Sequence, residues 1–175
     1  MKYKVVQFRY SDEGSLVLTN IYAANVETVA LLAFAVWTVV LLLFTVGIYR
    51  WSRILTRRVS VNEWRADETQ GSAFYQRAMR AHANCVENLP VFAAVIISLN
   101  AFQASSTLTA ISSVGIVGAR LLQSLLHVAL PQGVLVASLR FGAFFAQLLL
   151  MGVIVFVIVT SAEFLETVRL AMGAA

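Results

Sequence analysis

Long apolar stretches without a single charge constrain this chain more than any other feature. Residues 29–49 form an uncharged run of 21 residues rich in Leu, Val and Phe, and another 22 uncharged residues separate Arg140 from Glu163. A helix needs roughly 20 apolar residues to cross about 30 Å of hydrocarbon. With 59% apolar and only 13% charged residues, the chain exposes more hydrocarbon than a water-soluble domain of this length can bury. It therefore folds in lipid.

The remaining apolar sequence accommodates two further crossings. Residues 88–119 are uncharged, which is too long for one straight span, and polar, turn-prone residues interrupt them at Asn100, Gln103, Ser105, Ser106 and Thr107. We therefore predict one all-α domain over residues 1–175 with helices at 28–50, 74–103, 108–130 and 137–162. Backbone polar groups in the bilayer core have no water to bond to and must be paired within helices. An up-down four-helix bundle is therefore the simplest arrangement.

The arginines predict the orientation. Seven of them lie between Arg50 and Arg80, beside the first span, and Lys/Arg-rich loops are typically cytoplasmic. The sequence therefore predicts a cytoplasmic loop at 51–73, with a short interfacial helix near Trp64, and both termini on the opposite side. The net charge of +4 is explained by this loop and does not indicate nucleic-acid binding. We identify no removable signal peptide in the first 27 residues, and a short polar tail is expected after Glu163.

Polar residues on three of the predicted helices fall on one face each. Because ionisable groups in a span are costly, they usually face a cavity or a partner. Packing the three stripes together would build an electropositive pocket near the inner interface that suits a small anion. The stripes are Arg77, Arg80, Asn84, Glu87 and Asn88; Arg120, Gln123, Ser124 and His127; and Arg140 and Gln147.

Each stripe also has a purely structural interpretation. Arg80 and Glu87 are two turns apart and could form a buried ion pair, while Arg50, Arg53 and Arg77 could reach lipid headgroups. His127 could be a satisfied core histidine. The single cysteine, Cys85, is expected to be an inert buried thiol, the phenylalanines at 141, 144 and 145 are expected to serve packing, and no metal-ligand spacing is present.

One segment is similar to the signature of a known family. Residues 77–92 read Arg-Ala-Met-Arg-Ala-His-Ala-Asn-Cys-Val-Glu-Asn-Leu-Pro-Val-Phe, which resembles the membrane-associated proteins in eicosanoid and glutathione metabolism, the MAPEG family. Residues 120–127, Arg-Leu-Leu-Gln-Ser-Leu-Leu-His, resemble the family's third-helix segment, and Arg140 stands where the family keeps an arginine. The resemblance extends from about residue 26 to the C-terminal tail.

The resemblance implies a homotrimer that binds glutathione as co-substrate between subunits, toward the cytoplasmic side. It implies Arg140 near the sulfur as the catalytic residue. The residues that it implies around the tripeptide are Arg50 or Arg53, Arg77, Arg80, His82, Asn84, Glu87, Arg120, Gln123 and His127. A bacterial-type member in the inner membrane is expected, in contact with lipid and with a hydrophobic electrophile as second substrate.

Two positions depart from characterised members. The third helix has Gln123 and His127 where those members commonly have His and then Tyr, and Phe141 replaces the serine of the prostaglandin E synthase branch. A prostaglandin isomerase is therefore not expected. The first hypothesis is a glutathione-dependent transferase or peroxidase, and its rival is a non-catalytic bundle, or a lipid- or thiol-binding one, in which the polar stripes only hold helices together.

Overall fold

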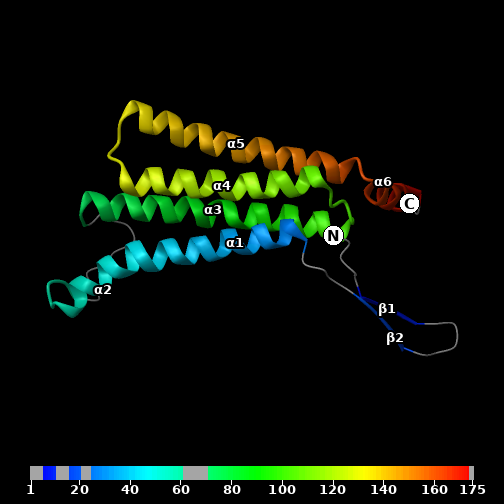
Figure 1. Ribbon diagram of the computed structural model, residues 1–175, viewed down its shortest axis with the longest axis horizontal. Helices are drawn as coiled ribbons and strands as arrows, with labels where there is room; N and C mark the ends of the chain where they lie inside the picture. The colour runs from blue at the N-terminus through cyan, green and yellow to red at the C-terminus, as the bar shows by residue number, and fades with distance from the viewer. Residues whose placement is uncertain (1–5, 11–15, 21–24, 61–70, 174–175) are drawn as a thin grey trace.

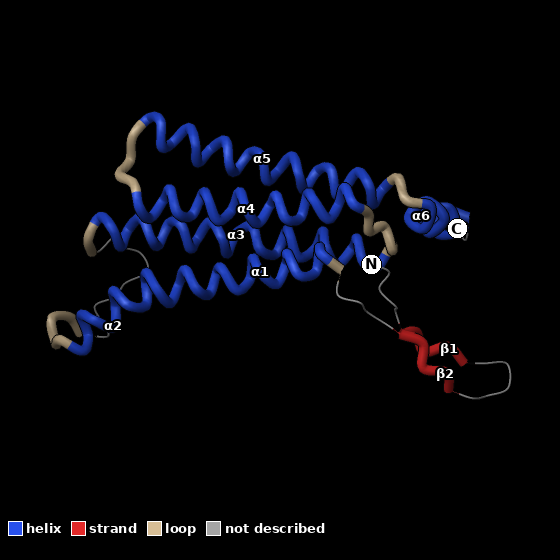
Figure 2. Tube along the Cα trace, viewed as in Figure 1, coloured by secondary structure: helices blue, strands red, loops and turns tan. Residues whose placement is uncertain are grey.

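A computed structural model describes residues 6–10, 16–20, 25–60 and 71–173 of the chain. Four long helices run side by side (Figures 1 and 2). In chain order the elements are β1 (Val6–Tyr10), β2 (Leu16–Asn20), α1 (Val26–Leu41), η1 (Leu42–Gly47), α2 (Ile48–Leu55), α3 (Ala73–Ala101), α4 (Thr107–Ala129), α5 (Val134–Val159) and α6 (Ala162–Gly173).

The first span consists of three consecutive helical segments. Asn25 caps α1, because its side-chain oxygen accepts a hydrogen bond from the Thr28 N–H at 2.9 Å. The segment η1 is a π-helix, a widening by one residue per turn that helices use sparingly. The helix then continues through α2 to Leu55, five residues past the predicted end. Arg53, which was predicted to lie in the loop, is therefore on the same helix as Arg50, whereas Trp64 lies outside the described residues.

The next two helices form the predicted hairpin. Ser72 caps α3 by accepting from the Tyr75 N–H. Ser106 and Thr109 exchange hydrogen bonds in a capping box that begins α4. These short polar side chains satisfy amide groups that a helix end leaves open, so the polar cluster in the apolar run marks the turn.

Proline sets the end of α4. The residue before a proline is driven out of the helical region, and Leu130, which precedes Pro131, is extended with φ −107° and ψ 141°. The helix α5 begins after Gly133. The predicted polar tail instead folds as α6, whose Phe164 ring packs edge-on against Phe102 at 5.2 Å between centroids.

Apolar side chains fill the interior and also cover the outside. Phe34, Phe92, Ile116 and Ile154 are fully buried, and the Phe34 and Phe92 rings lie 5.7 Å apart. Leu, Val, Ile and Phe side chains remain exposed along the outer faces of the four helices. Four helices are long and apolar enough to cross a membrane, so lipid covers these faces and the chain is an integral membrane protein.

The prediction of an all-helical membrane bundle is confirmed, with one addition. Residues before α1 form a two-stranded antiparallel hairpin, β1 with β2, in which Phe8 pairs with Leu18. Figure 1 shows it projecting away from the bundle. These strands were not predicted, because the mixed charges of this segment indicated only that it lies outside the bilayer.

Candidate functional site

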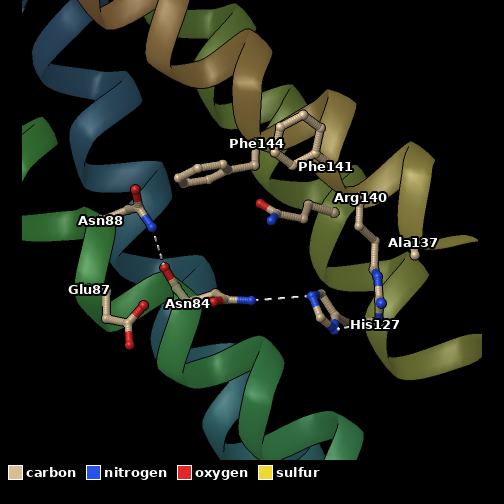
Figure 3. Close-up of a pocket in the computed structure, with 9 residues that line it drawn as sticks. Asn84, Glu87, Asn88, His127, Ala137, Arg140, Phe141 and Phe144 are labelled. Carbon is tan, nitrogen blue, oxygen red and sulfur yellow. Dashed lines mark hydrogen bonds between the residues drawn. The ribbon is translucent and has the colours of Figure 1, made fainter. Parts of the chain in front are cut away.

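A groove of about 470 Å³ opens between α3, α4 and α5 (Figure 3). It lies toward the end of the bundle where α3 and α5 begin and α4 ends, the same end that carries the arginine-rich α2. Its size falls within the range of about 300–1,000 Å³ that is usual for small-molecule sites. The lining residues are Asn84, Glu87, Asn88, Gln123, His127, Ala137, Arg140, Phe141 and Phe144.

Helical spacing places these side chains on the groove. Residues three and four apart share a helix face, which explains why α3 contributes Asn84 together with Glu87 and Asn88. The same spacing brings Gln123 and His127 together on α4. Polar and ionisable side chains raise the free energy of a helix in hydrocarbon. Packing the three stripes against one another removes these side chains from the lipid.

His127 joins the three helices at the centre of the site. Arg140 donates from Nη1 to Nδ1 of His127 at 3.0 Å. On the other side of the ring, the amide nitrogen of Asn84, Nδ2, lies 3.2 Å from Nε2. Figure 3 shows His127 between these two side chains, one from α3 and one from α5. A continuous chain of hydrogen bonds therefore crosses the groove.

Two glutamines close the interior side of the site. Gln147 donates from Nε2 to Oε1 of Gln123 at 3.0 Å, and also to the backbone oxygen of Ala143 at 2.9 Å. Both glutamines are buried. Their amides therefore join α4 to α5 behind the groove, as expected if the polar stripes of these two helices pack against one another.

One side of the groove is aromatic. Phe141 and Phe144 line it next to Arg140, and Figure 3 places them across the groove from Asn84 and Glu87. Phe141 is largely exposed and its ring is parallel to that of Phe145, 6.3 Å away. The groove thus has a polar side and an apolar side, and Arg140 lines it from α5 with its guanidinium against His127.

Several predicted site residues lie elsewhere in this single chain. Arg77 donates from Nε to the backbone oxygen of Val128 at 3.3 Å, near the end of α4. Arg80 is exposed and His82 is partly buried, and neither lines the groove. Arg80 and Glu87 are not within ion-pair distance in the part of the chain that the structure describes, so the structural ion pair considered for them is absent here.

Arg120 is fully buried in the core. Its guanidinium lies over the Phe34 ring, 5.3 Å from the centroid, and its Nε and Nη2 groups have no hydrogen-bond partner among the described residues. Cys85 is buried nearby, with Sγ 3.5 Å from the hydroxyl of Ser124, which in turn donates to the backbone oxygen of Arg120. Arg120 therefore lies behind the groove and does not line it.

The first-helix arginines belong to an aromatic cluster. Tyr49 and Tyr75 stack at 4.6 Å between centroids. Arg53 lies over the Tyr49 ring at 4.9 Å, and Arg50 lies over Tyr75 at 5.6 Å while donating from Nε to the Tyr75 hydroxyl at 2.6 Å. Cation–π contacts of this kind hold both guanidinium groups at the arginine-rich end of the bundle.

The polar half of the groove was thus predicted better from the sequence than the apolar half. Asn84, Glu87, Gln123, His127 and Arg140 all line it. Asn88 was placed on the correct face but not among the candidate ligands, and its i,i+4 relation to Asn84 was the available signal. The aromatic lining was missed, since nothing in the sequence distinguishes a phenylalanine that faces lipid from one beside a groove.

Comparison with known proteins assigns the chain to a family. No curated protein matches the chain in a sequence search. The model of the MAPEG family matches residues 27–160, which include all four spanning helices almost completely and every residue that lines the groove. Because the match covers most of the chain, this protein belongs to the MAPEG family, the membrane-associated proteins in eicosanoid and glutathione metabolism.

Proposed function

We propose that the protein binds glutathione in the groove and uses its thiolate to conjugate or reduce hydrophobic electrophiles. The observation that carries the proposal is the position of Arg140. This arginine is held by His127 and lines the same groove as the polar residues of α3 and two phenylalanines of α5. Such an arrangement suits a reaction between a charged tripeptide and an apolar partner.

The polar lining fits part of the glutathione molecule group by group. Glutathione carries two carboxylates, one ammonium and amide groups. Glu87 is exposed in the groove and can accept the ammonium, while the amides of Asn84, Asn88 and Gln123 match peptide groups. Arg140 provides the cation for the sulfur, because a nearby positive charge favours the thiolate over the thiol.

The two carboxylates need further cations. In a single chain, Arg77 and Arg80 are on α3 outside the groove, and Arg50 and Arg53 belong to the aromatic cluster. A homotrimer would supply cations from a second copy at the open side of the groove. The trimer is therefore part of the proposal, with glutathione bound between neighbouring subunits.

The chemistry requires little from the protein beyond positioning and charge. The thiolate sulfur forms a bond to an electrophilic carbon, whose leaving group departs with its electron pair. With a hydroperoxide, two glutathione molecules are oxidised to the disulfide while the peroxide is reduced to an alcohol and water. In both reactions Arg140 stabilises the negative charge on the sulfur that attacks.

The second substrate reaches the site from the bilayer in this proposal. Phe141 is exposed on the outer surface of α5 and also lines the groove, which supports access for an apolar molecule dissolved in lipid. We place the arginine-rich end of the bundle, and with it the groove, on the cytoplasmic side of an inner membrane. Glutathione is then taken from the cytoplasm.

A non-catalytic bundle is the alternative that a specific observation favours. The polar groups in and behind the groove already bond to one another, as in the pairs His127–Arg140 and Gln123–Gln147. Interhelical hydrogen bonds of this kind hold membrane helices together without any ligand. A measurement that separates ligand binding from stability is therefore needed.

Thermal unfolding of the detergent-purified protein, with and without millimolar glutathione, makes this separation. A ligand at 100 times its Kd stabilises the folded state by about 2.7 kcal/mol. We expect glutathione to raise the midpoint of the wild-type protein, and to raise it much less in Arg140→Met and Arg80→Ala. Arg169 is exposed on α6, so Arg169→Met is the matched control and should keep the full shift.

The rival has a different outcome in the same experiment. If the stripes are only structural, Arg140→Met lowers the midpoint equally with and without glutathione, and the wild-type midpoint does not respond to the tripeptide. If glutathione binds, conjugation to a chloro-dinitrobenzene in detergent micelles or liposomes then tests for turnover. Binding without conjugation or peroxide reduction would contradict the catalytic part of the proposal.

A further inference from the structure

We infer that His127 is not a ligand of the substrate but the residue that positions Arg140. Its role is to accept a hydrogen bond from the guanidinium while held in one neutral tautomer by Asn84. The catalytic consequence rests on the proposed function. The hydrogen-bond assignment rests only on the geometry of the three side chains, so the two are tested separately below.

The tautomer of His127 follows from its partner. Arginine has only donors and cannot be an acceptor, so the contact from Arg140 Nη1 to His127 Nδ1 at 3.0 Å requires a lone pair on Nδ1. An imidazolium has a proton on both nitrogens and cannot provide that lone pair. His127 is therefore neutral in this arrangement, with its proton on Nε2.

The orientation of Asn84 then follows. The structure has the amide nitrogen of Asn84 3.2 Å from Nε2. With Nε2 as a donor, two donors would face each other, so we assign the amide with its oxygen and nitrogen exchanged and the oxygen toward the ring. The oxygen and nitrogen of an amide are assigned from the hydrogen-bond network, and here the network selects Oδ1 toward His127. Asn88 donates to the backbone oxygen of Asn84 at 2.8 Å, one turn along the same helix.

This chain of donors and acceptors holds Arg140 in one position but leaves some of its N–H groups able to bind an anion. Arginine carries five N–H donors, and the bond to His127 is the hydrogen bond that Arg140 makes within the described part of the chain. Its other N–H groups remain for an anion in the groove. A long side chain that would otherwise sample many rotamers is held in one, which is the main requirement for electrostatic catalysis.

These two contacts exclude a direct role for His127. Both ring nitrogens are already engaged, so His127 has no free donor for the sulfur and no free lone pair to take the thiol proton. The residue touching the sulfur would be Arg140 alone. The sequence resemblance had placed His127 among the glutathione ligands, and the geometry assigns it a positioning role in their support.

Two substitutions separate the ring nitrogens. The amide of asparagine reaches the place of Nδ1, whereas the amide of glutamine reaches the place of Nε2. His127→Asn therefore keeps an acceptor for Arg140, and His127→Gln keeps only the contact with Asn84. Ser138→Ala, a change on α5 of an exposed hydroxyl that bonds to its own helix at Val134, is the control.

Nitrogen NMR of the histidine-labelled full-length protein tests the assignment without any ligand. The chain has only two histidines, so the spectrum of His127→Asn identifies the signals of His82 by elimination. We expect His127 to show a protonated Nε2 and an acceptor Nδ1 whose shift moves in Arg140→Met. A protonated Nδ1, a charged ring, or no response to Arg140→Met would overturn the inference.

The ultraviolet absorbance of the glutathione thiolate tests the consequence. We expect His127→Gln to bind glutathione with little change in KM, but to form less thiolate and to lose about tenfold to hundredfold in kcat, the scale of a misplaced catalytic group. His127→Asn should recover most of both, and Ser138→Ala should match the wild type. Equal loss in both His127 variants, or lost glutathione binding, would make His127 a ligand or a structural residue.

Discussion

Arg120 offers a quantitative test of the packing at the centre of the bundle. We predict that Arg120→Met stabilises the protein in the absence of glutathione. The side chain is 1% exposed, and two of its N–H groups lack a hydrogen-bond partner among the described residues. Methionine has a similar length, fills irregular core space well and carries no group that needs a partner.

The magnitude follows from the contacts of the guanidinium. Each unsatisfied buried donor costs about 1–3 kcal/mol, and the Phe34 ring at 5.3 Å returns up to about 2 kcal/mol as a cation–π contact. Replacing buried ionic groups by apolar ones of similar volume stabilises other proteins by about 1–4 kcal/mol. We expect a gain of this size, which corresponds to roughly 2–4 °C in the midpoint for each kcal/mol.

Thermal unfolding in detergent at one scan rate measures the change. Arg169→Met is again the control, because Arg169 is exposed and its ion pair with Glu166, at 3.9 Å, is a long surface contact. Surface pairs of this kind contribute about 0–1 kcal/mol. The control midpoint should therefore stay close to that of the wild type.

A fall in the Arg120→Met midpoint by several degrees would refute this reasoning. Such a fall would mean that the guanidinium has a strong partner in the assembled protein, since breaking a buried ion pair typically costs 3–5 kcal/mol. Chemical crosslinking of the variant would then show whether the oligomer is lost together with stability. An unchanged oligomer with a lower midpoint would place the partner within the same chain.

Three further predictions concern the fold. Phe34→Ala should destabilise the protein by about 3–5 kcal/mol, because Phe34 is fully buried against Phe92; a midpoint within a degree of the wild type would contradict the core assignment. Gly71→Ala should cost about 1–3 kcal/mol, because Gly71 has φ +93° and an added Cβ would lie 2.7 Å from Cδ1 of Tyr75, whereas Ser72→Gly should cost only a few tenths as a cap. A phosphatase that is active only outside the cytoplasm should be active when it is fused to the C-terminus. The proposed orientation would be reversed if this phosphatase fusion were inactive and a separate C-terminal fusion to a reporter that fluoresces only in the cytoplasm were fluorescent.

Much of the fold could be read from short-range features of the sequence. The length and the apolar composition of a helix indicate whether it can span a membrane, so the four spans were predictable from the sequence. Ser106 and Pro131 marked helix ends, because capping and proline act within one turn of the chain. The continuation of the first span beyond residue 50 was not predicted, since Arg50 on this helix contacts Tyr75, which lies far away in the sequence.

The candidate site was only half predictable. Helical periodicity correctly placed Asn84 and Glu87 on one face of α3, and His127 on the polar face of α4. It could not show that Arg120 points into the core beside Phe34 while Arg80 points outward. A stripe defines a direction around its own helix, and the neighbour in that direction depends on how the helices pack.

The sequence by itself determined that this is a membrane protein, how many helices span the membrane, and which helix faces carry polar groups. Each of these properties depends on residues within a few helical turns of one another. Only the tertiary structure decided that His127 meets Arg140 and Asn84, and that two phenylalanines complete the groove. Lipid is as apolar as the helix faces that pack together, so the hydrophobic pattern does not distinguish a helix contact from a lipid contact. Shape and hydrogen bonding between helices make that choice.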